Sequence, residues 1–151
     1  MTTRLTRHFT LEEMTTTQVR DVSNVPDAQQ RANLLRLCET AMEPVRAKFG
    51  PIHVNSGFRS AAVNARIGGS KTSAHMQGLA CDFVPLRKGV TLRQICDWVI
   101  SSGAVPYDQV IYEFGRWVHL GLAADGKAPR KQALMIFAAG VYRPYDPTVI
   151  G

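Results

Sequence analysis

A long apolar stripe at helical spacing dominates the first third of the chain, at positions 34, 37, 38, 41, 42, 45 and 49. We expect this helix to begin near Pro26-Asp27, because proline suits the first helical turn. Pro44 predicts a kink or a short break, since it has no backbone N–H to donate, and Gly50-Pro51 ends the segment. Thr10-Leu11-Glu12-Glu13 is a capping-box sequence that predicts a short helix before the stripe.

Short apolar-rich runs predict strands in the rest of the chain, at residues 52–55, 79–84, 134–137 and 141–142. Two further runs, at 109–114 and 117–122, flank Gly115-Arg116 and predict a β-hairpin. A small helix is expected over residues 61–67, and a second capping box opens a helix over about 91–102. This order predicts an α+β fold: a small, mostly antiparallel sheet with helices packed around it.

Length and composition favour a single domain over residues 1–151, because 45% apolar residues suffice for a sizeable core. Residues 34–122 carry the motifs described below, and residues 1–25 are interpreted as an N-terminal leader. The three cysteines form an odd set with no CxxC spacing, which argues against a disulfide framework and a cysteine-bound zinc module. We therefore expect buried thiols in a reduced compartment.

The net charge of +6 favours polyanionic surroundings, such as nucleic acid, an anionic wall polymer or a membrane surface. The basic residues are scattered rather than clustered, so no specific nucleic-acid binding is expected. Neither a secretory h-region nor an apolar run long enough to span a membrane is found. We expect a monomer that is cytoplasmic on synthesis.

Two segments carry residues that suit a metal. His75 and Asp82 lie seven positions apart, and His119 follows in Trp117-Val118-His119. Two imidazoles and a carboxylate are ligands of catalytic zinc sites that leave a position open for water. On the residues alone, a buried salt bridge or a strand end at the surface is the more common explanation of Asp82, and a lone histidine such as His119 is more often a core or edge residue than a ligand. His8 and His53 are assigned no function.

The segment from Ser73 to Asp82 fits S-x-H-x-x-G-x-A-x-D at all five fixed positions, which resembles the zinc-binding signature of the M15-type metallopeptidases. This family includes zinc D-Ala-D-Ala carboxypeptidases, related dipeptidases and phage endolysins. Ser56-Gly57-Phe58-Arg59-Ser60 is similar to the family's SGYRS block, and Trp117-Val118-His119 to its late W-x-H. Residues 34–122 resemble the short, single-domain, phage-associated branch in order and spacing.

The resemblance implies a zinc site at the sheet with His75, Asp82 and His119 as ligands. It also implies a zinc peptidase that uses activated water to hydrolyse peptidoglycan stem-peptide or cross-link bonds involving D-amino acids. Such an enzyme acts on the cell wall after phage-type release or as part of a virion. A catalytically silent zinc domain of the same fold, acting as a wall-binding or virion module, is the alternative. A peptidase acting on a peptide outside the wall, and a basic nucleic-acid-associated protein, are further alternatives.

Glu113 is the candidate general base, although the family often places its glutamate three residues before the last histidine, where this chain has Arg116. A two-residue turn at Gly115-Arg116 would direct Glu113 away from His119. A three-residue loop over residues 114–116 pairs Glu113 with Trp117 and places it on the ligand face. The catalytic interpretation therefore predicts the three-residue loop, while the alternative is an exposed hairpin glutamate.

Arg59 is the candidate cation, both for stabilising the oxyanion and for binding a substrate carboxylate, because its guanidinium can bind two oxygens at once. The alternative is a surface arginine at a helix start. Ser73 is a candidate for orienting a ligand or contacting substrate. Asp108 is a second candidate acid, but its position after Pro106-Tyr107 is typical of a turn.

Overall fold

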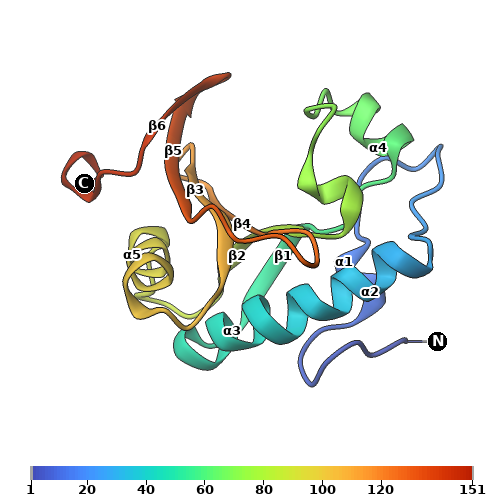
Figure 1. The fold of residues 1–151 in the computed structure, drawn as a ribbon, viewed down its shortest axis with the longest axis horizontal. Coiled ribbons are helices and arrows are strands. Elements are labelled where there is room, and N and C mark those ends of the chain that lie inside the picture. Colours follow the sequence, from blue (N-terminus) through green and yellow to red (C-terminus); the bar gives the residue numbers. More distant parts are fainter. Residues whose placement is uncertain (1, 151) are drawn as a thin grey trace.

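The structure of the protein, a computed structural model, describes residues 2–150. A six-stranded sheet in the order β1-β2-β4-β3-β5-β6 forms its centre (Figure 1). Four of the five strand pairings are antiparallel, and β3 pairs with β5 in parallel. The predicted α+β class with a mostly antiparallel sheet is confirmed. The strands are β1 (Ile52–Ser56), β2 (Ala80–Pro85), β3 (Tyr107–Glu113), β4 (Trp117–Leu122), β5 (Gln132–Ala138) and β6 (Val141–Pro144).

The helices begin where capping residues predict them. Thr10 and Thr91 each accept a hydrogen bond from the backbone N–H three residues later, so both predicted capping boxes are confirmed. Asp27 caps α2 in the same way, and Pro26 therefore precedes the cap instead of lying in the first turn. The α-helices are α1 (Leu11–Met14), α2 (Ala28–Leu37), α3 (Glu43–Phe49), α4 (Ala61–Arg66) and α5 (Leu92–Ser102). The 3₁₀ helices are η2 (Ala74–Gln77) and η3 (Pro147–Val149).

Pro44 interrupts the long helix as expected. The chain forms a π-helical segment, η1 (Cys38–Met42), between α2 and α3, and Pro44 lies in the first turn of α3. The N–H of Glu43 donates to the carbonyl of Cys38, five residues earlier. A wider turn accommodates the proline, which has no N–H to donate and clashes with the carbonyl four residues before it.

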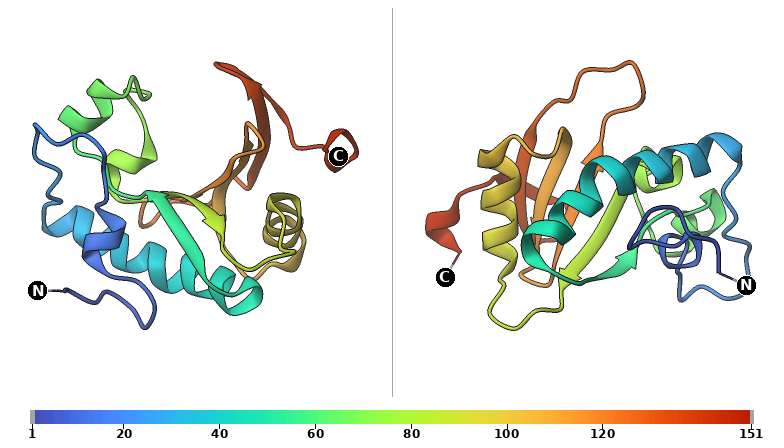
Figure 2. Two further views of the ribbon diagram at one scale, coloured as in Figure 1. Left: turned by 180° about the vertical axis from the view of Figure 1, so that it is seen from behind. Right: turned by 90° about the horizontal axis from the view of Figure 1, so that it is seen from below.

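The hydrophobic core lies between one face of the sheet and the helices α2, α3 and α5 (Figures 1 and 2). Side chains of β2 and β4 that alternate with the polar ones enter this core, and all of them are buried: Cys81, Phe83, Val118 and Leu120. The three cysteines of the described chain are free and buried, and burial raises the pKa of both Cys38 and Cys96 to about 12. These thiols stay protonated at neutral pH.

The N-terminal segment packs into the same core. Phe9 and Met14 are fully buried among the apolar side chains of α2 and the sheet. Glu43 on α3 accepts hydrogen bonds from the Thr6 hydroxyl at 2.6 Å and from the backbone N–H of His8 at 2.8 Å. Residues 3–14 are thereby fixed to the helical layer.

The opposite face of the sheet, called the site face below, carries Asp82 on β2, His119 on β4 and Glu113 on β3. Figures 1 and 2 show α4 and the segment after it at one side of this face and the β5–β6 hairpin at the other. The helices α2, α3 and α5 lie behind the sheet and do not cover the site face. Within residues 2–150, no helix has the length and apolar character needed to cross a membrane.

Candidate active site

His75 is positioned by two local features of η2. The hydroxyl of Ser73 accepts the backbone N–H of His75 at 3.2 Å and caps the helix. Gly78 ends it with a φ of 74°, and a Cβ at this position would lie 2.5 Å from the carbonyl oxygen of Gln30 on α2. Only glycine allows both the left-handed turn and this close approach. The fixed glycine of the motif therefore anchors η2 against α2.

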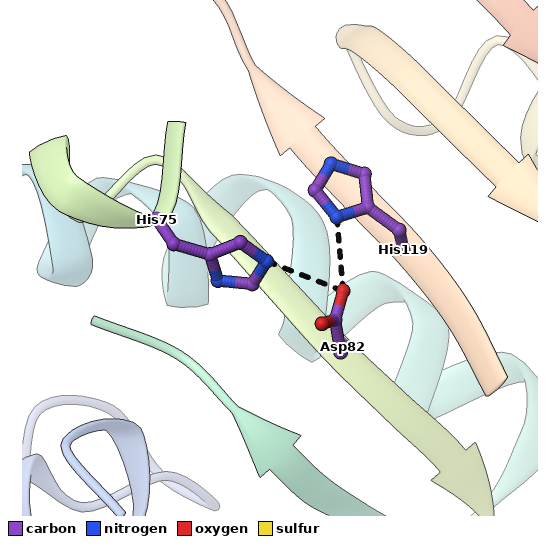
Figure 3. Close-up of side chains that lie close together, drawn as sticks. All are labelled: His75, Asp82 and His119. Carbon is purple, nitrogen blue, oxygen red and sulfur yellow. Dashed lines mark hydrogen bonds and ion pairs between the residues drawn. The ribbon is translucent and has the colours of Figure 1, made fainter. Parts of the chain in front are cut away.

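The ring of His75 is held in one orientation. Its Nδ1 lies 2.7 Å from the carbonyl oxygen of Gly57, which accepts a hydrogen bond from the ring N–H. The other nitrogen, Nε2, faces Asp82 at 3.3 Å from Oδ1 (Figure 3). Burial lowers the pKa of His75 and keeps the imidazole neutral. A neutral ring whose second nitrogen is bonded to a carbonyl is the usual state of a metal-binding histidine.

Asp82 and His119 come together through strand pairing. They lie directly opposite one another on β2 and β4, so their side chains share the site face. His119 Nδ1 is 2.9 Å from Asp82 Oδ1 (Figure 3). Burial by itself would raise the pKa of Asp82, but His75 and the hydrogen bond from His119 lower it well below its ordinary range. The carboxylate is therefore ionised and able to bind a cation.

The three side chains fit a zinc ion. Their ligand atoms, two nitrogens and one oxygen, all lie within 4.8 Å of one another. Two ligands on one tetrahedral zinc at about 2.0–2.1 Å are separated by about 3.3 Å, and the two distances to Asp82 Oδ1 are 3.3 and 2.9 Å. Imidazole nitrogens and a carboxylate oxygen are donors that zinc prefers, and these three lie close enough to bind the same ion.

Glu113 lies on the same face because of the hairpin loop. Residues 114–116 form the three-residue connection, so Glu113 pairs with Trp117 and Ile111 with His119. The φ angles of Phe114 and Gly115 are 56° and 66°, and the Arg116 N–H closes the turn on the Glu113 carbonyl at 2.9 Å. This is the register that the catalytic interpretation of Glu113 requires, and the two-residue turn is absent from this hairpin.

The Glu113 carboxylate is close to the histidine pair. Its Oε1 lies 3.8 Å from His119 Nδ1, and its side chain is 15% exposed. Burial and the negative charge of Asp82 both raise the pKa of Glu113 above its ordinary value. The glutamate therefore has a higher proton affinity than a solvated carboxylate and is not an exposed hairpin residue.

Arg59 approaches the site from the turn before α4. Its backbone N–H donates to the carbonyl of His75 at 3.0 Å, and its Nη2 lies 3.5 Å from the Ser73 hydroxyl. Burial lowers the pKa of Arg59, while the charges of Asp82 and Glu113 oppose this shift. The buried Nε has no hydrogen-bond partner among residues 2–150. A half-buried guanidinium within electrostatic reach of two carboxylates is not an ordinary surface arginine.

Other polar candidates lie elsewhere. Asp108 stands on β3 rather than in a turn, at a register shift between Tyr107 and Gln109, and its carboxylate accepts a hydrogen bond from Arg130 at 2.8 Å. His8 pairs with Glu43 at 2.7 Å, and His53 is exposed on β1. Gly57, within the Ser56–Ser60 block, orients His75, a role that no local pattern predicted. Asn24, which has no motif around it, bonds to Phe58 and Ser60.

A comparison with known protein families decides the class of the chain. The family model described as Peptidase M15 matches residues 7–121. The chain belongs to the peptidase M15 family. The matched region of this M15 peptidase includes His75, Asp82, His119, Glu113 and Arg59, together with most of the N-terminal segment. No curated protein matches the chain.

Proposed function

We propose that this M15 peptidase is a zinc-dependent hydrolase of peptidoglycan, cleaving stem-peptide or cross-link bonds that involve D-amino acids. One observation carries the proposal: the Glu113 carboxylate stands 3.8 Å from His119, beside a His75–Asp82–His119 cluster whose spacing suits one zinc ion. A ligand cluster alone serves structural and binding sites equally. A carboxylate with a raised pKa next to an open ligand set is the arrangement that hydrolysis needs.

His75, Asp82 and His119 would hold the metal, and His75 Nε2 and His119 Nδ1 are the nitrogens that face Asp82 Oδ1. Bound zinc acts as a Lewis acid that polarises a carbonyl and lowers the pKa of water to about 7. The chain itself keeps the ligands ready for the ion. Gly57 fixes the ring of His75, and strand pairing holds Asp82 opposite His119.

Glu113 acts as the general base in this proposal. Its carboxylate accepts the proton of the attacking water and later delivers it to the leaving amine. A base with a raised pKa performs both steps better than a solvated glutamate, because its conjugate acid holds the proton until the amine leaves. The adjacent turn fixes its position, since Phe114 and Gly115 hold left-handed conformations.

Arg59 stabilises negative charge on the substrate. Its guanidinium lies within electrostatic reach of Glu113 and Asp82, and we propose that its terminal nitrogens donate to a developing oxyanion or to a substrate carboxylate. The Ser73 hydroxyl lies 3.5 Å from the Arg59 guanidinium and caps η2. We also propose that this hydroxyl contacts the substrate.

The substrate class rests on family membership and charge. The formal charge of +6 favours association with anionic wall polymers, and added salt should weaken that association. We further propose that the chain works as a single-domain monomer, after phage-type release or as part of a virion.

Mass spectrometry of purified muropeptides, incubated with the protein in the presence and absence of a zinc chelator, tests the function. We expect cleavage that the chelator abolishes and that added zinc restores. Unchanged muropeptides in both samples would reject the enzyme. Zinc binding without cleavage would instead favour a silent zinc domain that serves as a wall-binding or virion module.

Glu113→Ala separates catalysis from metal binding. We expect cleavage to fall by about 100-fold or more while zinc stoichiometry stays at wild-type level, because Glu113 acts as the base and not as a ligand. Glu39→Ala is the matched control, since Glu39 is exposed on η1, behind the sheet. Equal cleavage by the Glu113→Ala variant and the control would remove Glu113 from the mechanism.

A further inference from the structure

The β5–β6 hairpin lies beyond residue 121, where the family match ends, yet it continues the site face. Strand registers align four residues in one row across the sheet. Trp117 on β4 pairs with Glu113 on β3, which pairs with Ile136 on β5, which pairs with Tyr142 on β6. Directly opposite residues in neighbouring strands project to the same side of a sheet. Tyr142 therefore shares the site face with Glu113, two strands away.

Tyr142 is accessible although its row partner is not. Its side chain is 54% exposed, whereas Ile136 between it and Glu113 is 3% exposed. Figures 1 and 2 show the hairpin at the side of the site face opposite α4. A ligand lying over Glu113 and His119 thus has an exposed phenol beside it, with an apolar floor at Ile136.

The electrostatics of the phenol agree with this placement. Partial burial, followed by the negative charges of Glu113 and Asp82, raises the pKa of Tyr142. These two carboxylates belong to the site, so the hydroxyl lies within their electrostatic reach. The phenol remains protonated at neutral pH and is available as a hydrogen-bond donor.

We propose that Tyr142 is a substrate-binding residue of this peptidase, and that its hydroxyl donates a hydrogen bond to a carbonyl or carboxylate oxygen of the bound peptide. The inference rests on the proposed function, because the ligand is the peptide cleaved beside Glu113. Arg59 and Tyr142 then contact the substrate from opposite sides of the metal ligands. The hairpin supplies a contact that the family-matched residues do not contain.

The neighbours of Tyr142 provide a matched control. Val141 precedes it on β6 and is 51% exposed. It pairs with Ala138 at a register shift, and its side chain has no hydrogen-bond donor. Tyr142→Phe removes only the hydroxyl, whereas Val141→Ala removes exposed apolar atoms from the same hairpin and no hydrogen-bond donor. Neither change affects a buried side chain.

Steady-state kinetics on the muropeptide that the wild-type protein cleaves fastest tests the inference. We expect Tyr142→Phe to lower kcat/KM by about tenfold, mainly through a higher KM, because a binding hydrogen bond is lost. Val141→Ala should match the wild type. Wild-type kcat/KM in the Tyr142→Phe variant would overturn the proposal, and so would an equal loss in the Val141→Ala variant.

Binding measurements separate this inference from the proposed function. Isothermal titration calorimetry of the same muropeptides with Glu113→Gln, alone and combined with Tyr142→Phe, reports binding without cleavage. We expect about tenfold weaker binding in the double variant. If the wild-type protein binds muropeptides without cleaving them, the peptidase is rejected. Weaker binding by the double variant would then still support Tyr142, and equal binding by the two variants would contradict it. If muropeptides are neither bound nor cleaved, both proposals are wrong.

Discussion

Gly57 makes two close approaches that a side chain would prevent. Its carbonyl oxygen accepts the Nδ1–H of His75 at 2.7 Å, and a Cβ at this position would overlap the carbonyl oxygen of Met14. The next residue, Phe58, donates its N–H to the same Met14 carbonyl at 2.7 Å. A single glycine therefore connects α1, β1 and the ring of a proposed metal ligand.

Gly57→Ala should consequently damage both stability and metal binding. We expect a loss of about 1–3 kcal/mol in the free energy of unfolding from overpacking, and at least about tenfold weaker zinc binding. Thermal unfolding and competition with a chromophoric chelator measure these two quantities. Gly68→Ala is the control: with φ of 72° and no neighbour within 4 Å, it should cost about 1 kcal/mol and leave zinc affinity unchanged. Equal zinc affinity in both variants would contradict the role of Gly57.

At the scale of elements, the β3–β4 loop decides which side of the sheet Glu113 occupies. Side chains alternate with a period of two, so a change of one residue in loop length reverses every side chain of one strand relative to the other. The present loop of three residues keeps Glu113 level with Trp117. The placement of Asp82 opposite His119 depends on the β2–β4 pairing, which this loop does not determine.

Deleting Arg116 should therefore separate the base from the metal site. A two-residue loop would pair Phe114 with Trp117 and direct Glu113 toward the helices, so we expect cleavage to fall by about 100-fold or more. Zinc stoichiometry should persist, because His75, Asp82 and His119 keep their supports. Arg116→Ala preserves the loop length and should remain active. Cleavage at the wild-type rate in the deletion variant would show that the loop length is irrelevant to catalysis.

At the scale of the whole molecule, Glu43 joins the N-terminal segment to the helical layer. One oxygen of its carboxylate accepts from the Thr6 hydroxyl and the His8 N–H, and the other lies 2.7 Å from the His8 ring. Burial raises the pKa of Glu43, but these hydrogen bonds outweigh burial and lower the pKa overall. The ionised form is thus the one that stabilises the fold.

Glu43→Gln should lower the free energy of unfolding by about 1–2 kcal/mol at pH 7, because charge-assisted hydrogen bonds are lost. A lowered folded pKa means that this contribution is fully present above the unfolded value near 4.5 and disappears as pH falls through the folded value. Urea unfolding should therefore show a difference in the free energy of unfolding between wild type and variant that becomes smaller in acid. Glu39→Gln, an exposed control on η1, should have the same free energy of unfolding as the wild type. A destabilisation by Glu43→Gln that does not change with pH would refute the ionic role of Glu43.

Features that depend on neighbours along the chain could be predicted without the fold. Helix starts followed from capping residues such as Thr10 and Thr91, whose hydrogen bonds span three positions. The break near Pro44 followed from a missing N–H. The proposed ligands were identified from the motif at residues 73–82 and from Trp117-Val118-His119. The spacing of a family signature can be recognised without the fold.

The contacts between side chains from distant segments could be learned only from the folded chain. The sequence left two hairpin registers open, and strand pairing selected the one that places Glu113 beside His119. Asp108 was misplaced in a turn because its partner, Arg130, lies 22 residues away. The role of Gly57 depends on the orientation of its carbonyl, and that of Tyr142 on a row of paired residues across four strands. Neither arrangement produces a local sequence pattern. The chemistry of each group is local, whereas its position depends on long-range pairing that the folded core fixes.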